Sequence, residues 1–182
     1  MKGLWVWLSR INKCRGFGVQ SPFAYQFIRY VINEHSPYYS YKNLHDSDWL
    51  TRKLGKLYFR LSNWLQPENI VCLGKCKRFS RYLQAGCHRA RIIGMEECTD
   101  GTGALWIVSL DDTSFADIQG ILAMAATNSV LVIEGICSNH ETRFCWQQVK
   151  DSPYVNITFD LYYCGIVFFD KKRIKQHYVV NF

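Results

Sequence analysis

The chain has 182 residues, of which 48% are hydrophobic, so it is large enough to bury one core and fits a single structural domain. Its net charge of +7 is compatible with an acidic partner such as nucleic acid or a membrane surface, but no block of five like charges occurs, which favours an ordinary basic protein with dispersed charge. No secretory signal is recognisable, and we expect a cytoplasmic protein.

Residues 1–13, MKGLWVWLSRINK, are predicted to form a short aromatic and amphipathic segment. The segment is too short to span a bilayer and lacks the small-residue cleavage site of a signal peptide. It could lie on a membrane surface, but docking on its own domain or on a second subunit is the favoured interpretation.

Two helices are predicted before the first strand. Ser21-Pro22 opens a helix over residues 23–34, because proline suits the first turn of a helix. A tyrosine-rich connector follows, and leucines at three- and four-residue spacing then predict a helix over 49–65. We therefore expect residues 1–68 to be an N-terminal helical segment that packs on a core formed by residues 69–182, within one structural domain.

The stretch 69–80, NIVCLGKCKRFS, is predicted to contain a buried strand over 69–73, a turn at Gly74 and a helix over 79–85. A strand, glycine turn and helix that open a βα series form the place where a parallel sheet usually holds a nucleotide-like ligand. A turn of this kind normally carries several small residues, so that backbone N–H groups can approach the ligand. Here Gly74 is followed by Lys75, Cys76, Lys77 and Arg78.

Residues 90–97, ARIIGMEE, predict a second buried strand that ends in acids. An acid at this place commonly binds a ribose hydroxyl, which makes Glu96 or Glu97 a candidate ligand; a carboxylate that simply ends a strand at the surface is an equal alternative. Residues 98–103 are predicted to be only a turn, so a third strand and its helix have no room. The free sheet edge beside 90–97 could then pair two subunits.

The rest of the chain continues the βα pattern and ends in β structure. Strands are predicted over 105–110 and 129–136, and helices over 113–127 and 140–150. The runs 155–162 and 165–170 predict an antiparallel pair, and residues 176–182 an extended tail. The fold class is therefore α/β and Rossmann-like, with a mostly parallel sheet and a C-terminal antiparallel β-pair.

Eight cysteines are spread over the chain, several of them inside predicted strands or helices, which favours reduced thiols over a disulfide framework. One cluster deserves comparison with a zinc site: Cys72, Cys76, Cys87, His88 and Cys98. Its spacings match no paired CxxC arrangement, so we expect no zinc.

Four longer matches point to a known family: GFGVQSPF at 16–23, RKLGKLYFRL at 52–61, SVLVIEGI at 129–136 and DLYYCGIVFFDKKRIKQHY at 160–178. With these motifs and its order of elements, the chain resembles a class I S-adenosylmethionine-dependent methyltransferase-like family of Bacteroidetes, as a shortened and degenerate member. The resemblance implies a Rossmann-like methyltransferase fold, with S-adenosylmethionine as the cofactor.

The resemblance also implies roles for four residues. Gly74, Glu96 and Asp111 would bind the cofactor, with Glu96 matching the family's ribose-binding acid, and Glu134 and Asp111 would lie at the reaction centre. Related O-methyltransferases use paired acids to hold a divalent metal, but the oxygen ligands here are incomplete and no metal is expected.

Two departures from the family pattern fall at the glycine turn. Cys72 replaces an acid and Arg78 replaces a second glycine. The guanidinium of Arg78 would project toward the methionine part of the cofactor and face its sulfonium, which should weaken binding.

Three functions remain open from the sequence. The first is a binding or scaffold protein that kept the methyltransferase framework, lost most of its catalysis, and binds a small molecule or a protein partner. The second is an active methyltransferase acting on a small-molecule hydroxyl. The third, less favoured, is a nucleic-acid-binding protein that uses a basic cluster near the turn: Lys75, Lys77, Arg78, Arg81, His88, Arg89 and Arg91.

Overall fold

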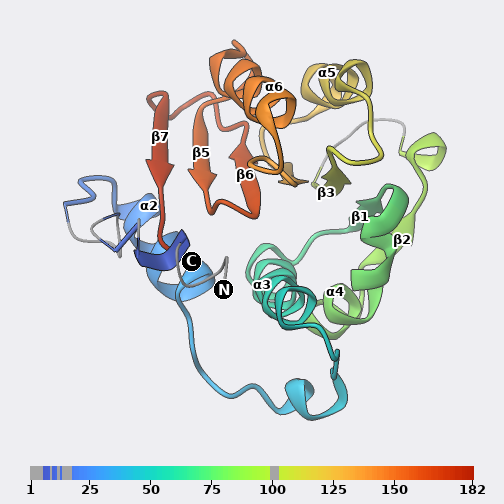
Figure 1. Cartoon of the computed structure of the whole chain (residues 1–182). Helices are drawn as coiled ribbons and strands as arrows, with labels where there is room; N and C mark the ends of the chain where they lie inside the picture. The colour runs from blue at the N-terminus through green and yellow to red at the C-terminus, as the bar shows by residue number, and fades with distance from the viewer. Residues whose placement is uncertain (1–5, 9, 12, 14–17, 99–102) are drawn as a thin grey trace.

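The strands of the described part of the chain form one seven-stranded sheet in the order β2-β1-β3-β4-β6-β5-β7 (Figure 1). The computed structural model describes residues 6–8, 10, 11, 13, 18–98 and 103–182. The strands are β1 (Asn69–Cys72), β2 (Arg91–Ile93), β3 (Ala104–Ser109), β4 (Val130–Glu134), β5 (Ile157–Asp160), β6 (Cys164–Phe168) and β7 (Gln176–Val179).

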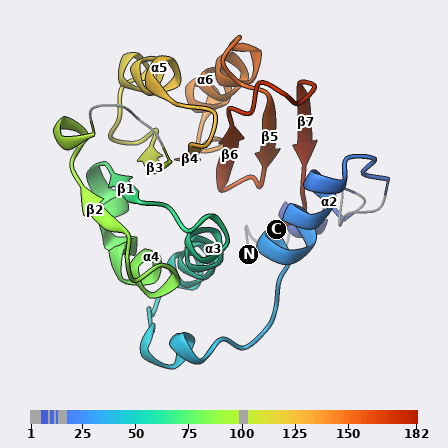
Figure 2. The ribbon, with the colours of Figure 1, turned by 180° about the vertical axis from the view of Figure 1, so that it is seen from behind.

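Strands β2, β1, β3 and β4 are parallel, β6 pairs antiparallel with both β4 and β5, and β7 pairs parallel with β5. Figure 2 shows β4 between β3 and β6, where the parallel part meets the antiparallel pair. The α/β Rossmann-like fold class with its C-terminal antiparallel pair is thus confirmed. The predicted extended tail contributes the additional strand β7.

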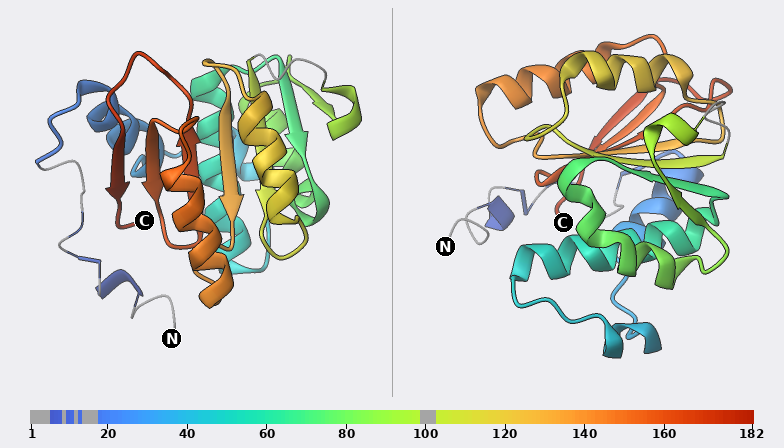
Figure 3. Two further views of the ribbon diagram at one scale, coloured as in Figure 1. Left: turned by 90° about the horizontal axis from the view of Figure 1, so that it is seen from above. Right: turned by 90° about the vertical axis from the view of Figure 1, so that its right-hand side faces the viewer.

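Helices cover both faces of the sheet (Figure 3). The helices α5 (Phe115–Met124) and α6 (His140–Asp151) lie on one face. On the other lie α2 (Pro22–Phe27), α3 (Trp49–Leu65) and α4 (Ser80–Gly86), with a π-helical turn, Ile28–Ile32, that continues α2. Short 3-10 helices span Tyr39–Asn43, Gly74–Phe79 and Met95–Glu97.

The central strands are apolar at nearly every position because both of their faces are buried. In β3, Leu105 and Ile107 join the hydrophobic cluster under α2, α3 and α4, whereas Trp106 and Val108 join the cluster under α5 and α6. Residues of the N-terminal segment, such as Phe27, belong to the same cluster as the strands. The N-terminal helices therefore pack directly on the sheet.

Capping side chains start the helices where the sequence predicts them. Ser21, Ser114 and Asn139 each accept a hydrogen bond from a backbone N–H in the first turn of α2, α5 and α6, and Asp48 does the same for α3. The predicted range 49–65 of α3 is confirmed. Helix α5, Phe115–Met124, is shorter at both ends than the predicted 113–127. Ser114 and its capping box fix its start.

Described residues of the N-terminal segment contact the C-terminal part of the chain. Arg10 forms an ion pair of 2.8 Å with Asp160 at the end of β5, and its guanidinium lies 5.3 Å from the ring centroid of Tyr162. The amide of Asn181 donates to the carbonyl oxygen of Trp7. No helix of the described residues combines the length and apolarity needed to cross a bilayer.

The prediction of a buried strand over 90–97 was wrong in length and burial. Only Arg91–Ile93 is a strand, Met95–Glu97 forms a 3-10 turn, and no residue from 91 to 97 is fully buried. Among the described strands β2 pairs only with β1, so no described strand lies on its outer side. Between β2 and β3 the described residues contain no further strand, while residues 99–102 of the predicted turn lie outside them.

Candidate ligand site at the carboxyl ends of the parallel strands

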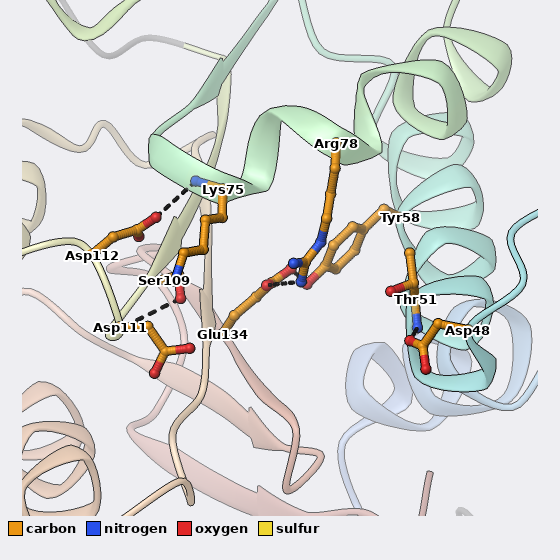
Figure 4. A network of polar contacts seen from close by, with 9 residues as sticks. All are labelled: Asp48, Thr51, Tyr58, Lys75, Arg78, Ser109, Asp111, Asp112 and Glu134. Carbon is orange, nitrogen blue, oxygen red and sulfur yellow. Dashed lines mark hydrogen bonds and ion pairs between the residues drawn. The ribbon is translucent and has the colours of Figure 1, made fainter.

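The parallel strands bring three sequence-distant segments to one edge of the sheet. β1 ends at Cys72, β3 at Ser109 and β4 at Glu134. The segments that follow carry Gly74 and Asp111, so the predicted site residues other than Glu96 lie at these strand ends. Figure 4 shows Asp111 and Glu134 here, with Lys75 of the glycine turn. In open parallel sheets this edge is the usual ligand-binding side.

The glycine turn after β1 is filled by a carboxylate of the same chain. Gly74 has a φ of +54°, a conformation that favours glycine, and the next N–H, that of Lys75, donates to Asp112 Oδ2 over 2.7 Å. A Cβ added at Gly74 would lie 2.2 Å from that same oxygen. The turn is tight, but the backbone N–H of Lys75 in it already donates to the Asp112 carboxylate.

Glu134 lies buried at the end of β4, with 5% of its surface exposed. The hydroxyl of Tyr58 donates to Glu134 Oε1 over 2.7 Å, and Arg78 Nη2 lies 3.1 Å from Oε2 (Figure 4). Burial raises the pKa of Glu134, while the Tyr58 hydrogen bond and the Arg78 charge act in the opposite direction. Burial also raises the pKa of Tyr58 well above its ordinary value. Both oxygens of Glu134 are thus bound by side chains of the protein.

Asp111 is exposed beside this network and is not hydrogen-bonded to Glu134 in the described contacts. Its backbone N–H donates to Ser109 Oγ over 3.2 Å, and its carboxylate faces Gly135, where an added Cβ would lie 3.6 Å from Oδ1. The negative charges of Asp112 and Asp111 contribute to the raised pKa of Glu134. Of the two predicted catalytic residues, Asp111 therefore acts electrostatically on Glu134 without a direct hydrogen bond.

Glu96 lies apart from the network. It is exposed on the 3-10 turn after β2 and folds back over Gly94, where an added Cβ would lie 2.9 Å from Glu96 Oε2. Its role as a ribose ligand, like the roles of Gly74, Asp111 and Glu134, stays a prediction.

The cysteines near the turn are buried thiols. Burial raises the pKa of Cys72 to about 12 and raises that of Cys76 as well. Among the described residues no group of three or more His, Cys, Asp or Glu side chains is placed to hold a metal ion.

The basic cluster considered for nucleic acid is largely engaged with the protein itself. Arg81 donates to the Asn43 carbonyl over 2.9 Å, and Arg89 and Arg91 donate over 3.5 and 3.3 Å to oxygens of Gln66 and Asn69. Together with the Arg78 ion pair, these contacts give the arginines structural partners.

Sequence reasoning missed Tyr58. The helical spacing places Tyr58 among the buried leucines of α3, and a buried tyrosine hydroxyl usually has a hydrogen-bond partner. That rule could have signalled a polar partner at the sheet, but its identity depends on a contact across 76 positions of sequence.

No family model matches the chain, and no curated protein matches it significantly. Among solved structures, the fold is similar to the crystal structure of cofactor-bound Rv0187 from MTB, with a TM-score of 0.50. The match has 14% sequence identity and covers 72% of this chain and 86% of that one. At this level of identity the likeness supports the α/β fold; the finer assignment to a Bacteroidetes family stays a prediction.

Proposed function

We propose that this chain is a shortened methyltransferase-like protein that no longer transfers methyl groups and acts by binding a small molecule or a protein partner. Two contacts near the glycine turn carry this proposal. The Lys75 amide donates a hydrogen bond to the Asp112 carboxylate, and Arg78 forms an ion pair with Glu134. Both contacts use groups that an S-adenosylmethionine site would need for its ligand.

The residues present fit the cofactor poorly. A ligand that takes the Lys75 amide must first displace Asp112, and hydrogen bonds to charged groups contribute about 1.5–3 kcal/mol each. The Arg78 guanidinium would also repel a cofactor sulfonium placed beside it, and the ion pair with Glu134 reduces this repulsion without removing it. Since each 1.4 kcal/mol weakens binding roughly tenfold, displacing Asp112 alone costs about one to two orders of magnitude in affinity, and the Arg78 charge adds to that loss.

The engaged state of Glu134 also argues against hydroxyl methylation. A general base or metal ligand needs a lone pair that the substrate or metal can reach, and here Glu134 is 5% exposed and already accepts one bond on each oxygen, from Tyr58 and from Arg78. An active methyltransferase is therefore the alternative that the cofactor titration must exclude.

The test is calorimetric titration of the protein with S-adenosylmethionine. We expect no binding by the wild-type chain at millimolar cofactor. The double variant Arg78→Gly/Asp112→Ala should gain weak binding, since it restores the family's glycine and frees the Lys75 amide. A matched control, Arg89→Gly/Asp151→Ala, removes the same two charges away from the turn and should not bind.

A micromolar dissociation constant for the wild-type chain would disprove the proposal. If the double variant stays folded and still does not bind, the two side chains are not the reason for the lost affinity. Methyl transfer to any hydroxyl substrate by the wild-type chain would favour the alternative.

Two further parts of the proposal concern partners and location. The outer side of β2 offers an edge for pairing with a second copy of the chain, which light scattering of the purified protein would detect. We place the protein in the cytoplasm.

A further inference from the structure

A second possible site lies away from the glycine turn, on the face of the sheet covered by α2 and α3. A cavity of about 740 Å³ lies between the π-helical turn, α3 and the end of the chain after β7. Figure 1 shows the end of β7 running down beside α2. The cavity is within the size range of small-molecule sites.

The cavity carries an excess of positive charge. Its lining includes four basic side chains, Arg29, Lys53, Lys56 and Arg60, and one carboxylate, Glu34. In the described part of the chain none of the four forms an ion pair. Glu34 accepts a hydrogen bond of 2.6 Å from the Ser36 amide, and this partner lowers its pKa.

Arg60 fixes the wall of the cavity. It is 7% exposed and donates to the carbonyl oxygens of Val31 and Ile32 over 2.6 and 3.0 Å. These bonds hold the π-helical turn against α3. Arg60 therefore supplies charge to the cavity while it maintains its shape.

Lys53 and Lys56 hold their ammonium groups over aromatic rings. Lys53 Nζ lies 4.5 Å from the ring centroid of Phe182 and 4.9 Å from that of Trp49, and Lys56 Nζ lies 4.9 Å from that of Tyr41. Burial lowers the pKa of Lys53. An ammonium group that lies over a ring still has N–H groups free to donate hydrogen bonds to a ligand oxygen.

Two amide side chains in the lining leave polar atoms unsatisfied. Asn181 is 4% exposed, and its Oδ1 has no hydrogen-bond partner among the described residues, although its Nδ2 donates to the carbonyl oxygen of Trp7. The Nδ2 of Asn33 is buried and likewise has no partner within the described part of the chain. Buried polar atoms without partners are costly, and both residues line this cavity, so a polar ligand that reaches these atoms would offset that cost.

We propose that this cavity binds a small organic anion with a carboxylate or phosphate group and an aromatic or apolar body. The anionic group would contact Lys53 and Lys56, polar atoms of the ligand would satisfy Asn33 and Asn181, and the body would pack near Phe182. The site shares no residue with the Gly74 network, so the proposal holds whether or not that turn binds a cofactor.

The test compares three probes that share a phenyl ring: phenyl phosphate, benzoate and neutral phenol. Each is titrated in phosphate-free buffer of low ionic strength, and binding is followed by amide NMR shifts. We expect at least one anion to bind roughly tenfold or more tightly than phenol, since one charged contact accounts for such a ratio. The stronger of the two anions identifies the preferred group. The shifted amides should lie in residues 29–35, 53–60 and 181–182.

The variant Lys53→Gln/Lys56→Gln should weaken binding of the preferred anion roughly tenfold or more. The matched control Lys171→Gln/Lys172→Gln removes the same charge from exposed positions and should bind like the wild type. The proposal is overturned if phenol binds as tightly as both anions, if the shifted amides lie elsewhere, or if the folded double variant binds unchanged. The wild-type probe comparison decides the matter even if the double variant fails to fold.

Discussion

Replacing Tyr58 by phenylalanine tests the hydrogen bond that supports the buried carboxylate of Glu134. Phenylalanine keeps the ring, which packs edge-to-face on Phe79 at 4.8 Å between centroids, so the change removes the hydroxyl and creates no large cavity. The lost bond joins a hydroxyl to a carboxylate, and bonds to charged groups contribute about 1.5–3 kcal/mol. We expect the free energy of unfolding to fall by that amount at pH 7.

The loss should depend on pH. Burial raises the folded-state pKa of Glu134 above its ordinary value of 4.5, so burial of its charge lowers the stability as the pH rises through the folded-state pKa. Tyr58 opposes this shift, because its hydroxyl stabilises the charged form. Without Tyr58 the pKa of Glu134 rises further, and the difference in stability between wild type and variant should be larger at pH 7 than near pH 4.5.

Urea unfolding of both proteins across this pH range measures the effect. The difference in unfolding free energy between variant and wild type is taken at each pH, so the titration of groups that the substitution does not affect cancels. Leu57→Ala, a cavity-forming change in the same helix, is a suitable control, since its cost should not vary with pH in this way. A loss that does not change with pH would refute the reasoning. So would a loss below about 0.5 kcal/mol at pH 7, because hydrogen bonds to charged groups contribute more than that.

Three further changes have expected costs that urea unfolding can measure. Gly74→Ala should cost more stability than Gly103→Ala. Both glycines have a positive φ, which costs alanine about 1–2 kcal/mol, but only at Gly74 would the added Cβ also clash with Asp112. Gly120→Ala should stabilise the protein by about 0.5–1 kcal/mol, because the Cβ meets nothing within 4 Å inside α5. Arg10→Ala should cost more than the roughly 0–1 kcal/mol of an exposed pair, since the Arg10 and Asp160 side chains are only 15% and 16% exposed, and equal stability would contradict this.

Local patterns predicted the helices and central strands well because each carries its own signal. Helix α3 has both a capping aspartate and a leucine repeat, and its range was predicted correctly. The strand at 90–97 failed because an apolar run does not reveal how many neighbours a strand will have. Burial of β2 depends on a further strand beside it, and that is a property of the whole sheet.

The position of the candidate residues in the fold was predictable from the sequence, whereas their contacts were so only in part, and their roles stay predictions. The rule for parallel sheets placed Gly74, Asp111 and Glu134 at one edge, and the structure places them there. The partners of Glu134 were not predictable, since Tyr58 and Arg78 come from elements that meet only through tertiary packing. The basic cavity was beyond sequence reasoning for the same reason, because its lining comes from segments near residues 30, 56 and 181.

Arg78 links the stability of the fold to the proposed loss of catalysis. A carboxylate as deeply buried as Glu134 is costly unless a cation or a donor compensates it. In a protein that binds a metal or a cationic cofactor, the ligand could supply that compensation. Here Arg78 supplies it, together with Tyr58. The side chain that we propose repels the cofactor therefore also compensates the buried charge of Glu134, so the carboxyl ends of the parallel strands are stabilised without a ligand.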